Sequence, residues 1–410
     1  MRGNRIRALS GVTGSAIGNA ASAMLLGVVT ARLLGPVGQG TLTLVTTTSA
    51  MTVLALSAGT GISLRVRSAP VPDPTDVRAF LGLSLGLMPL SGLVTMAAAW
   101  LLAARVVGLG ALVAIFAYGA AALLSRQASD LVQAYGRTSA SILSIGVGFL
   151  VQAVAFGALA GLGHRSVAGA LACGVLGAVA QCLFSWACIR AFRPALLATW
   201  RLERWLALIR QGAPTVGYGL GLLAMQRLDR LLLVPLAGPR AGGVYAVAAT
   251  VAEAARITSS AVGQLLFVRT AGSRGVTREV RHLYQLAVVL QLLIIGVLEL
   301  LAPWVVGQVF GADYLPAVPL LRGLLVAELF MGLALMDSRI VMGLGRLREV
   351  GAVTLASTSL AVAVYAVLIH AGGAAGAVQA SVATYAVYAT LLLWQRTRAA
   401  RTAERKPLNV

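Results

Sequence analysis

The sequence predicts an all-α polytopic membrane protein, with about twelve transmembrane helices in two six-helix lobes around a central cleft. Its 410 residues are 58% hydrophobic and only 11% charged, whereas soluble domains are usually about a quarter charged. Uncharged runs such as 33–64 and 79–104 exceed the roughly 20 apolar residues that a helix needs to cross a hydrocarbon core. A repeat after 203 residues indicates the two lobes.

Breaks at charges, prolines and glycines divide the chain into candidate spans. The first follows Arg2, Arg5 and Arg7, as in a signal peptide, but its apolar stretch is long enough to span, so we expect a retained helix. The three cysteines match no metal or redox spacing, and no cofactor is predicted. The expected spans are 11–34, 41–64, 79–103, 108–127, 138–162, 167–191, 212–236, 241–267, 283–306, 316–338, 350–369 and 374–395.

Basic residues are distributed unevenly about these spans. Of the 33 Lys and Arg residues, 24 fall on one side, 4 on the other and 5 within spans. Cytoplasmic loops attract Lys and Arg, so we expect both termini in the cytoplasm. The same asymmetry accounts for most of the net charge of +20. A nucleic-acid partner is not predicted, because no aromatic–basic motif accompanies the charge.

The repeat is carried by ordered glycines and prolines. Gly35-Pro36 aligns with Gly238-Pro239, and each pair predicts a sharp turn because Pro fixes φ and cannot continue a helix. A G-x-x-x-G in the first helix of each copy, ending at Gly18 and Gly221, predicts close helix approach. Copies six spans apart run in the same direction, which is the parallel-repeat plan of transporters. The expected division is a lobe over 1–199, a cytoplasmic connector over 200–211 and a lobe over 212–410.

Three phrases of the sequence resemble one known family. ARLLGPVGQGTLTLV (31–45), QRLDRLLLVPLAGPRAGGVYAVAATVAEAARI (226–257) and VMGLGRLREVGAVTLAST (341–358) are similar to the polysaccharide exporter, or Wzx-like flippase, branch of the multidrug/oligosaccharidyl-lipid/polysaccharide (MOP) superfamily. The resemblance covers nearly the whole chain. It implies a transporter and not an enzyme, in the bacterial plasma membrane. The implied cargo is an undecaprenyl-linked oligosaccharide carried from the inner to the outer leaflet. Implied partners are the bilayer and polysaccharide polymerase or assembly proteins.

Charged residues inside the seventh and eighth spans are the main functional candidates. A charge at mid-bilayer costs at least roughly 2.5–3.5 kcal/mol on insertion scales, so such groups face partners or water. On a helical wheel, the charges of the seventh span share a broad face, and those of the eighth share one face. The candidate substrate-binding residues are Asn19, Arg32, Gln226, Arg227, Asp229, Arg230, Glu253 and Arg256.

These charges have two interpretations, which are compatible with each other. In the first, Arg227, Arg230 and Arg256 bind the pyrophosphate of a lipid-linked sugar, since the planar guanidinium binds phosphate bidentately. In the second, Asp229 pairs with Arg227 or Arg230, and Glu253 pairs with Arg256, so that the charges fix two helices.

Residues of the other spans also have alternative roles. Arg32 either contributes to the cleft from the first lobe or extends to the interface. Asn19, Gln152 and Gln181 either line the cleft or bond to a neighbouring helix, the second being favoured for Gln181. In the tenth span only Glu328 is expected to be deep, as a coupling site or a structural pair. The candidates for a coupling proton or Na⁺ are Asp229, Glu253 and Glu328.

Three other functions remain open. A drug/cation antiporter of the same superfamily needs a titratable carboxylate in its binding lobe, and the first three spans contain none. An integral-membrane polysaccharide enzyme needs a sizeable outer loop or an acidic metal-binding pair, and the expected outer loops are short. A scaffold without transport is the third. Alternating access by rocking of the lobes is the mechanism that the parallel repeat predicts.

Overall fold

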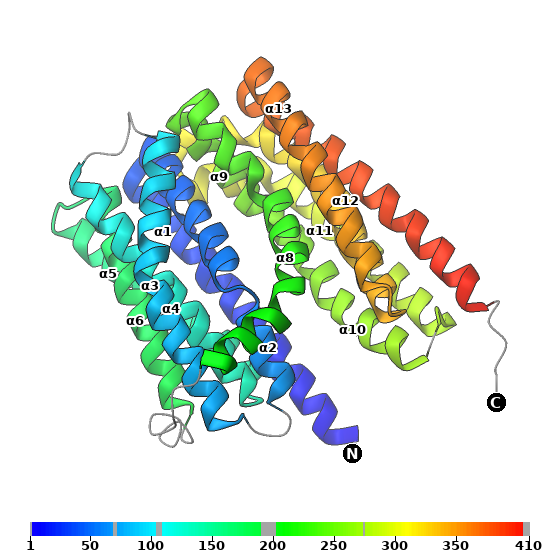
Figure 1. The fold of residues 1–410 in the computed structure, drawn as a ribbon. Coiled ribbons are helices and arrows are strands. Elements are labelled where there is room, and N and C mark those ends of the chain that lie inside the picture. Colours follow the sequence, from blue (N-terminus) through cyan, green and yellow to red (C-terminus); the bar gives the residue numbers. More distant parts are fainter. Residues whose placement is uncertain (1, 69–71, 104–108, 190–201, 274, 405–410) are drawn as a thin grey trace. The chain divides into compact units, whose positions relative to one another are not determined.

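The chain is helical throughout the part that its structure, a computed structural model, describes. That part comprises residues 2–68, 72–103, 109–189, 202–273 and 275–404, and within it no strand occurs (Figure 1). The chain is therefore an all-α polytopic membrane protein, which confirms the predicted fold class. It forms two compact units, unit 1 over 1–220 and unit 2 over 221–410.

Unit 1 contains the first six expected spans. The first predicted span and most of the second fall in one continuous helix, Arg2–Leu56, with a kink at Gly35. The second span, 41–64, was expected to be unbroken; it is interrupted after Leu56, where Ala58 and Gly59 adopt positive φ. The helices are α1 (Arg2–Leu56), α2 (Thr60–Arg67), α3 (Pro74–Ala103), α4 (Leu109–Ala134), α5 (Thr138–Gly161), α6 (Val167–Ala187) and the first part of α8 (Leu202–Ala237).

Small residues allow the helices of unit 1 to pack closely. A Cβ at Gly177 of α6 would lie 2.5 Å from the carbonyl oxygen of Gly148 in α5, so only glycine fits this crossing. Gln181 of α6 donates to the Ser125 carbonyl (3.1 Å) and to Ser129 Oγ (2.8 Å) of α4. The favoured role of Gln181, a hydrogen bond to a neighbouring helix, is confirmed.

Unit 2 contains the remaining spans, except that residues 212–220 of the seventh belong to unit 1. The two last predicted spans both belong to α13, which is kinked at Gly373 (φ 54°). Helix α12 packs against α9, α10, α11 and α13, and half of its apolar stretch is buried. The elements are the rest of α8, α9 (Pro239–Ala252), the 3₁₀ turn η2 (Glu253–Arg256), α10 (Ile257–Ser273), α11 (Arg278–Trp304), the π turn η3 (Val305–Phe310), η4 (Ala312–Tyr314), α12 (Ala317–Gly343) and α13 (Leu347–Glu404).

The two Gly-Pro turns of the repeat have closely similar backbones. Gly35 has φ 66° and ψ 179°, and Gly238 has φ 89° and ψ 163°. L-residues essentially do not enter this region, so glycine is required at both turns. Pro then sets the φ of the first residue of the next helical segment. The predicted sharp turn is confirmed in both copies.

Of the G-x-x-x-G glycines, Gly221 makes the predicted close approach and Gly18 does not, while Gly14 lies outside the residues whose side-chain surroundings are described. The Thr358 hydroxyl of α13 donates to the Gly221 carbonyl (2.8 Å), and a Cβ at Gly221 would lie 3.2 Å from Thr354. At Gly18, by contrast, a Cβ would meet nothing within 4 Å. The close approach to α1 comes instead from Gly146 of α5, whose added Cβ would lie 3.5 Å from the Asn19 Cα. The prediction for Gly18 is wrong because sequence spacing does not fix the rotation of a helix.

The predicted connector is the beginning of a long helix. Its first two residues, 200 and 201, lie outside the described part, and residues 202–211 are the first turns of α8. Leu208 is fully buried in a cluster with Leu64, Val77 and Phe80. Arg204 Nη1 lies 3.0 Å from Asp76 Oδ1. These contacts anchor the start of α8 in unit 1.

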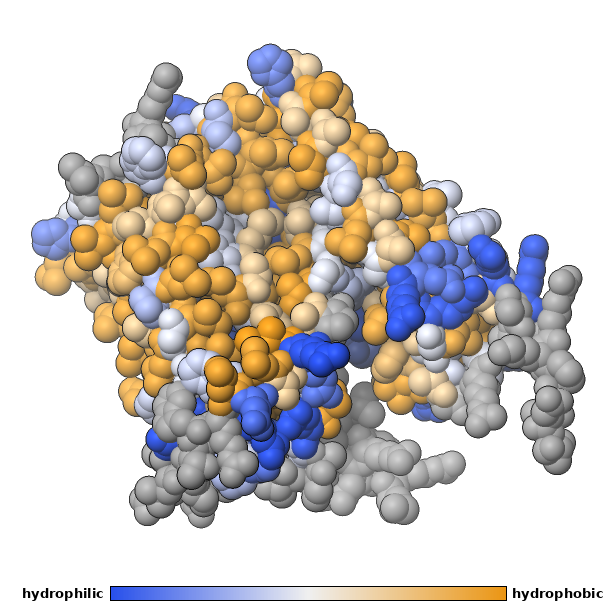
Figure 2. All heavy atoms as spheres, viewed as in Figure 1, coloured by the Kyte–Doolittle hydropathy of each residue, from blue (hydrophilic) through white to orange (hydrophobic). Residues whose placement is uncertain are grey.

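The surface is apolar where a membrane would cover it. Eight helical segments of the described residues are long and apolar enough to span. In each unit, hydrophobic side chains cover the middle of the visible face; in unit 2, hydrophilic ones gather where α10 and α13 end (Figure 2). Leu300 and Leu101 are 82% and 73% exposed. Such large exposed apolar areas are typical of a surface in contact with lipid.

Candidate functional site

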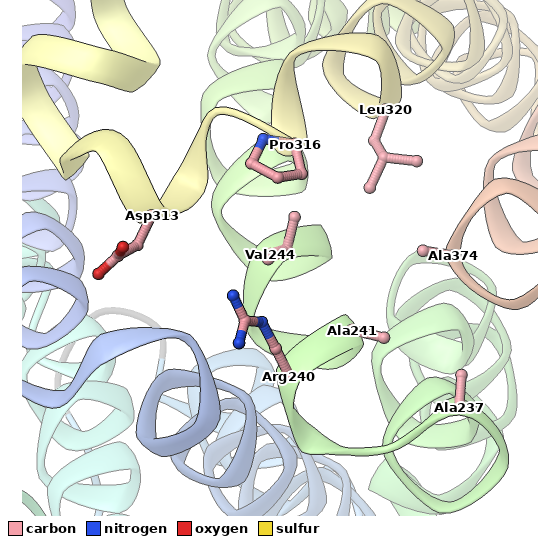
Figure 3. Close-up of a pocket in the computed structure, with 8 residues that line it drawn as sticks. All are labelled: Ala237, Arg240, Ala241, Val244, Asp313, Pro316, Leu320 and Ala374. Atoms are coloured by element: carbon pink, nitrogen blue, oxygen red, sulfur yellow. The ribbon is translucent and has the colours of Figure 1, made fainter.

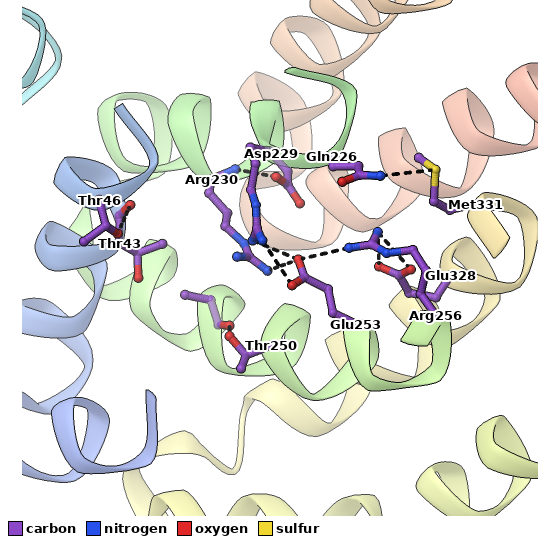
Figure 4. Close-up of polar contacts among 12 residues, drawn as sticks. Thr43, Thr46, Gln226, Asp229, Arg230, Thr250, Glu253, Arg256, Glu328 and Met331 are labelled. Atoms are coloured by element: carbon purple, nitrogen blue, oxygen red, sulfur yellow. Dashed lines mark hydrogen bonds and ion pairs between the residues drawn. The ribbon is translucent and has the colours of Figure 1, made fainter. Parts of the chain in front are cut away.

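The candidate site lies inside unit 2 and is formed by three elements. α8 supplies Arg227, Asp229 and Arg230, the 3₁₀ turn η2 supplies Glu253 and Arg256, and α12 supplies Glu328. Figure 4 labels all of these residues except Arg227. In a 3₁₀ turn, residues three apart project in the same direction. Glu253 and Arg256 therefore point the same way from their turn, whereas in a regular α-helix they would share a face but differ by about 60° in direction.

Glu253 is the centre of the network. Its carboxylate accepts two hydrogen bonds from Arg227, Nη1 to Oε1 at 2.9 Å and Nη2 to Oε2 at 3.3 Å. Arg230 Nη2 donates to the same Oε1 at 2.6 Å. Arg256 Nη2 lies farther away, at 3.8 Å. Three guanidinium groups thus face one carboxylate, and the Arg227 pair has the bidentate geometry that favours planar anions.

Arg256 pairs mainly with Glu328. Arg256 Nη1 lies 3.2 Å from Oε1 and 3.1 Å from Oε2 of Glu328. The predicted pair of Glu253 with Arg256 exists as the longer contact, because Arg256 reaches toward α12. Glu328 is deep, as expected, with a side chain only 8% exposed. Gln291 of α11 donates to the Glu328 backbone carbonyl (2.8 Å), which ties a third helix to this pair.

Asp229 has no side-chain ion pair among those formed by the described residues. It accepts from the Tyr245 hydroxyl (2.7 Å) and from the Arg230 backbone N–H (2.7 Å). Tyr245 lies 3.2 Å from Ser381 Oγ, which lies 2.8 Å from the Tyr365 hydroxyl. The expected pairing of Asp229 with Arg227 or Arg230 is wrong, because its side chain points toward α9 and α13 rather than toward η2.

The network has an accessible end and a buried end. Arg227 and Glu253 side chains are 27% and 22% exposed, whereas those of Arg230 and Glu328 are each 8% exposed. Arg230 Nε is buried without an acceptor. Gln226 contacts only the Met331 sulfur among its described partners, at 3.9 Å, which is a weak interaction. An anion that entered beside the accessible Glu253 carboxylate would supply the acceptor that the Arg230 Nε–H lacks.

The remaining predicted site residues belong to unit 1. Arg32 is exposed on α1. Asn19 is half-buried, and its Oδ1 is shielded from solvent without a hydrogen-bond donor. Gln152 Nε2 approaches the Ala170 carbonyl at 3.5 Å. The assigned cleft-lining roles of Arg32 and Asn19 stay predictions.

The comparisons with known proteins agree with this architecture. The sequence matches the family model described as polysaccharide biosynthesis protein over residues 9–267, more than half of the chain. The chain belongs to this family. This match agrees with the resemblance to polysaccharide exporters that the sequence phrases carry. No curated protein matches the sequence significantly.

Solved structures share the fold of this polysaccharide biosynthesis protein. An inward-facing multidrug resistance MATE family transporter of the MOP superfamily has a TM-score of 0.70 and 18% identity, covering 97% of this chain and 96% of its own. The outward-facing form has a TM-score of 0.65 and 18% identity, covering 97% of both chains. A MOP superfamily transporter from Pyrococcus furiosus, described as having a binding pocket of reversed polarity, has a TM-score of 0.64 and 18% identity, covering 97% and 96%.

A second buried ion pair of this family member was not predicted. Asp337 of α12 is 1% exposed and lies 2.7 Å from Arg396 of α13. The Arg396 guanidinium also lies over the Tyr284 ring, 4.6 Å from its centre. Burial inside the protein does not locate Asp337 along the membrane normal, so the expectation that only Glu328 is deep in the bilayer in this span stays a prediction. The sequence signal for this pair was Arg396, just after the last predicted span. It was counted among the loop arginines that predict membrane orientation and was not considered as a partner of Asp337.

A separate hollow of unit 2 is mostly apolar. Its volume is about 490 Å³, and alanines line it together with Val244, Pro316 and Leu320 (Figure 3). Arg240 and Asp313 are its two charged residues, and both are exposed. Because these charges are accessible to solvent, the hollow offers weaker anion binding than the Arg227–Arg230 pair.

Proposed function

We propose that this protein is a flippase for a lipid-linked oligosaccharide, whose pyrophosphate is bound by Arg227 and Arg230. The family and the fold support a membrane transporter; the cargo is our proposal. An undecaprenyl-linked precursor of a cell-surface polysaccharide fits the family name. The same proposal places the protein in the bacterial plasma membrane with both termini in the cytoplasm, next to polysaccharide polymerase or assembly proteins.

One observation carries the proposal. Two guanidinium groups, one helical turn apart on α8, converge on a single anion, at 2.9 Å from Arg227 and 2.6 Å from Arg230. Arginine remains charged in any membrane environment and matches phosphate oxygens with its planar fork. A phosphate placed there offers acceptors to both guanidinium groups. One of its oxygens can accept from the Arg230 Nε–H, which is buried without an acceptor.

Arg256 has a different role in this proposal. Its guanidinium is held by Glu328 at 3.1 Å, and the pair is almost fully buried. The pair braces η2 against α12 and does not bind the cargo. Asp229, held only by neutral side chains and a backbone N–H, is then the leading candidate for a coupling proton. Alternating access of the two units completes the proposed cycle.

The test replaces the two arginines together. Arg227→Ala with Arg230→Ala is expected to abolish surface polysaccharide while protein abundance in the membrane stays near normal. The matched control is Arg322→Ala, which removes an exposed arginine paired with Glu299 at 2.9 Å and is expected to leave export unchanged. Normal export by the double variant would remove the phosphate-binding role.

A drug/cation antiporter remains the second candidate, since the described relatives include MATE transporters. In that case a carboxylate binds the cargo, and Asp229 is the carboxylate of the network without an arginine side-chain partner. Asp229→Asn would then abolish resistance to cationic dyes, while the arginine double variant would retain it. The flippase proposal predicts no dye transport by either the wild type or the variants.

A further inference from the structure

Glu253 stands where an anionic cargo would bind. We infer that Glu253 is a resident counter-anion that leaves Arg227 and Arg230 when the diphosphate of the cargo arrives, and returns when the cargo departs; this rests on the proposed function. The carboxylate is thus an internal competitor that sets the affinity of the site and prepares it for release.

The contacts of Glu253 support exchange rather than a permanent brace. All its side-chain hydrogen bonds go to Arg227 and Arg230. Those two arginines have no other side-chain ion pair within the described residues. Arg256, in contrast, keeps Glu328 when Glu253 moves away. Departure of one side chain therefore frees two guanidinium groups at once and leaves the deeper pair intact.

The backbone around Glu253 can accommodate the movement. Glu253 begins the 3₁₀ turn between α9 and α10, in the middle of one predicted span. A stretch of 3₁₀ in the middle of a helix often marks a hinge, because its hydrogen bonds are poorer than those of the α-helix. Relaxation of Glu253–Arg256 to α-helical geometry would rotate the Glu253 side chain by about 60° relative to Arg256. Glu253 then leaves the arginines while Arg256 remains at Glu328.

The acceptors also favour the incoming diphosphate. The Glu253 carboxylate satisfies both Arg227 nitrogens and one of Arg230, but leaves Arg230 Nε without a partner. In a lipid-linked sugar each phosphate of the diphosphate carries two non-bridging oxygens and one negative charge, so the diphosphate offers more acceptors and more charge than one carboxylate. It can therefore bond both arginines and also accept from the Arg230 Nε–H. Glu253 and the diphosphate cannot occupy the same place, and their like charges repel at short range.

The experiment measures binding of farnesyl diphosphate, the probe, to the purified full-length chain in detergent micelles by calorimetry. Glu253→Gln is expected to bind at least about tenfold more tightly than the wild type, because the competitor is gone. Glu299→Gln is the matched control: it removes a carboxylate that pairs with Arg322 at 2.9 Å, outside the network, and its affinity is expected to stay within about twofold of the wild type. Arg227→Ala with Arg230→Ala is expected to lose binding.

The outcomes separate the inference from the function on which it rests. Binding that survives in the double arginine variant overturns the proposed site. Loss of binding there, with Glu253→Gln no tighter than the wild type, preserves the site and overturns the exchange. A purely structural Glu253 predicts lower thermal stability and weaker binding together, whereas exchange predicts lower stability with tighter binding.

A second variant keeps the test valid where Glu253→Gln does not fold. Glu253→Asp retains the charge but is one methylene shorter, so it cannot bond both arginines as closely. Its affinity for farnesyl diphosphate is expected to rise severalfold, between those of the wild type and Glu253→Gln. An affinity equal to or below that of the wild type contradicts the exchange. Farnesol, which lacks the diphosphate, is expected to bind all variants equally.

Discussion

The two units of the repeat share their backbone features but not their charges. With the shift of 203 residues, Arg227 and Arg230 of unit 2 correspond to Met24 and Gly27 of unit 1, and Glu253 corresponds to Ala50. The Gly-Pro turn that follows the first helix is nonetheless the same in both. The duplicated scaffold therefore does not require the buried charges. Their presence in one copy only is consistent with the cargo-binding role proposed for unit 2.

The ion pairs of unit 1 lie elsewhere along their helices. Arg67, the last residue of α2, lies 2.8 Å from Asp76 at the start of α3, and Arg204 at the start of α8 lies 3.0 Å from the same carboxylate. Asp76 is itself buried, with 4% of its side chain exposed, but the Arg67 and Arg204 side chains are 27% and 35% exposed at their helix ends. The contrast shows that the position of a charge along a span, rather than the number of charges, separates anchoring pairs from candidate cargo sites.

The largest effect is expected from making unit 2 resemble unit 1 at one buried position. Arg256 corresponds to Val53. Arg256→Met leaves Glu328 without its cation at 3.1 Å, which should lower the free energy of unfolding by about 3–5 kcal/mol. Arg256→Met combined with Glu328→Met should recover most of this loss, since apolar replacement of a buried pair is often neutral. Denaturant titration in detergent micelles measures both.

If Arg256→Met alone unfolds within about 1 kcal/mol of the wild type, the pair is solvated and behaves like a surface salt bridge. The buried Arg256–Glu328 pair and the ion pairs of unit 1 would then contribute similarly to the free energy of unfolding.

A moderate loss of stability, equal in the two units, is expected from substitutions in the Gly-Pro turns that both units share. Gly35→Ala and Gly238→Ala place a Cβ on backbones with φ 66° and 89°, which should destabilise each variant by about 1–3 kcal/mol. The control is Gly157→Ala in α5, where a Cβ meets nothing within 4 Å. That substitution should stabilise by up to about 1 kcal/mol. Thermal unfolding of the three variants provides the measurement.

Clearly unequal losses at Gly35 and Gly238 would show that the two turns do not have equivalent roles in their units. The comparison between the copies would then be limited to backbone geometry.

The smallest effect concerns a single carboxylate at the edge of unit 1. The backbone N–H of Thr75, with a smaller contribution from its hydroxyl, lowers the pKa of Asp73 below its ordinary value of 3.8. A lowered pKa in the folded state means that the stabilisation is present above pH 3.8 and is lost as the pH falls through the folded value. Because the side chain is 46% exposed, the effect should be below about 1 kcal/mol.

Asp73→Asn should remove this contribution, so the variant loses less stability than the wild type between about pH 6 and about pH 3. Unfolding midpoints of the two proteins at both pH values provide the measurement. A larger loss of stability on acidification in Asp73→Asn than in the wild type would contradict the assignment. Thr75→Val should have part of the same effect, because it removes the hydroxyl that bonds to Asp73.

Much of the architecture could be predicted from local chemistry. Gly35-Pro36 ends the first span where the kink occurs, and Gly373 separates the last two. Turn chemistry is carried by one or two residues, so it is visible in the sequence. The break at Ala58 and Gly59 was missed because the uncharged run around it predicted one span, although Ser57, Gly59, Thr60 and Gly61 form a turn-type cluster.

The pairing of the buried charges could not be predicted in the same way. The helical wheel placed Arg227, Asp229 and Arg230 on one broad face, but Asp229 contacts Tyr245 while the arginines contact Glu253. An arginine side chain can extend toward any of several partners, and the rotation of each helix about its axis depends on all its neighbours. The 3₁₀ turn that aligns Glu253 with Arg256 has no recognisable sequence signature.

The sequence by itself determined that this chain is a multi-pass helical protein with a duplicated plan, because apolar length and Gly-Pro turns act locally. Only the tertiary structure decided that Glu253 holds Arg227 and Arg230, that Glu328 holds Arg256, and that Asp229 is held by Tyr245. Those contacts join residues of different helices, and their geometry follows from packing that no single stretch of sequence contains.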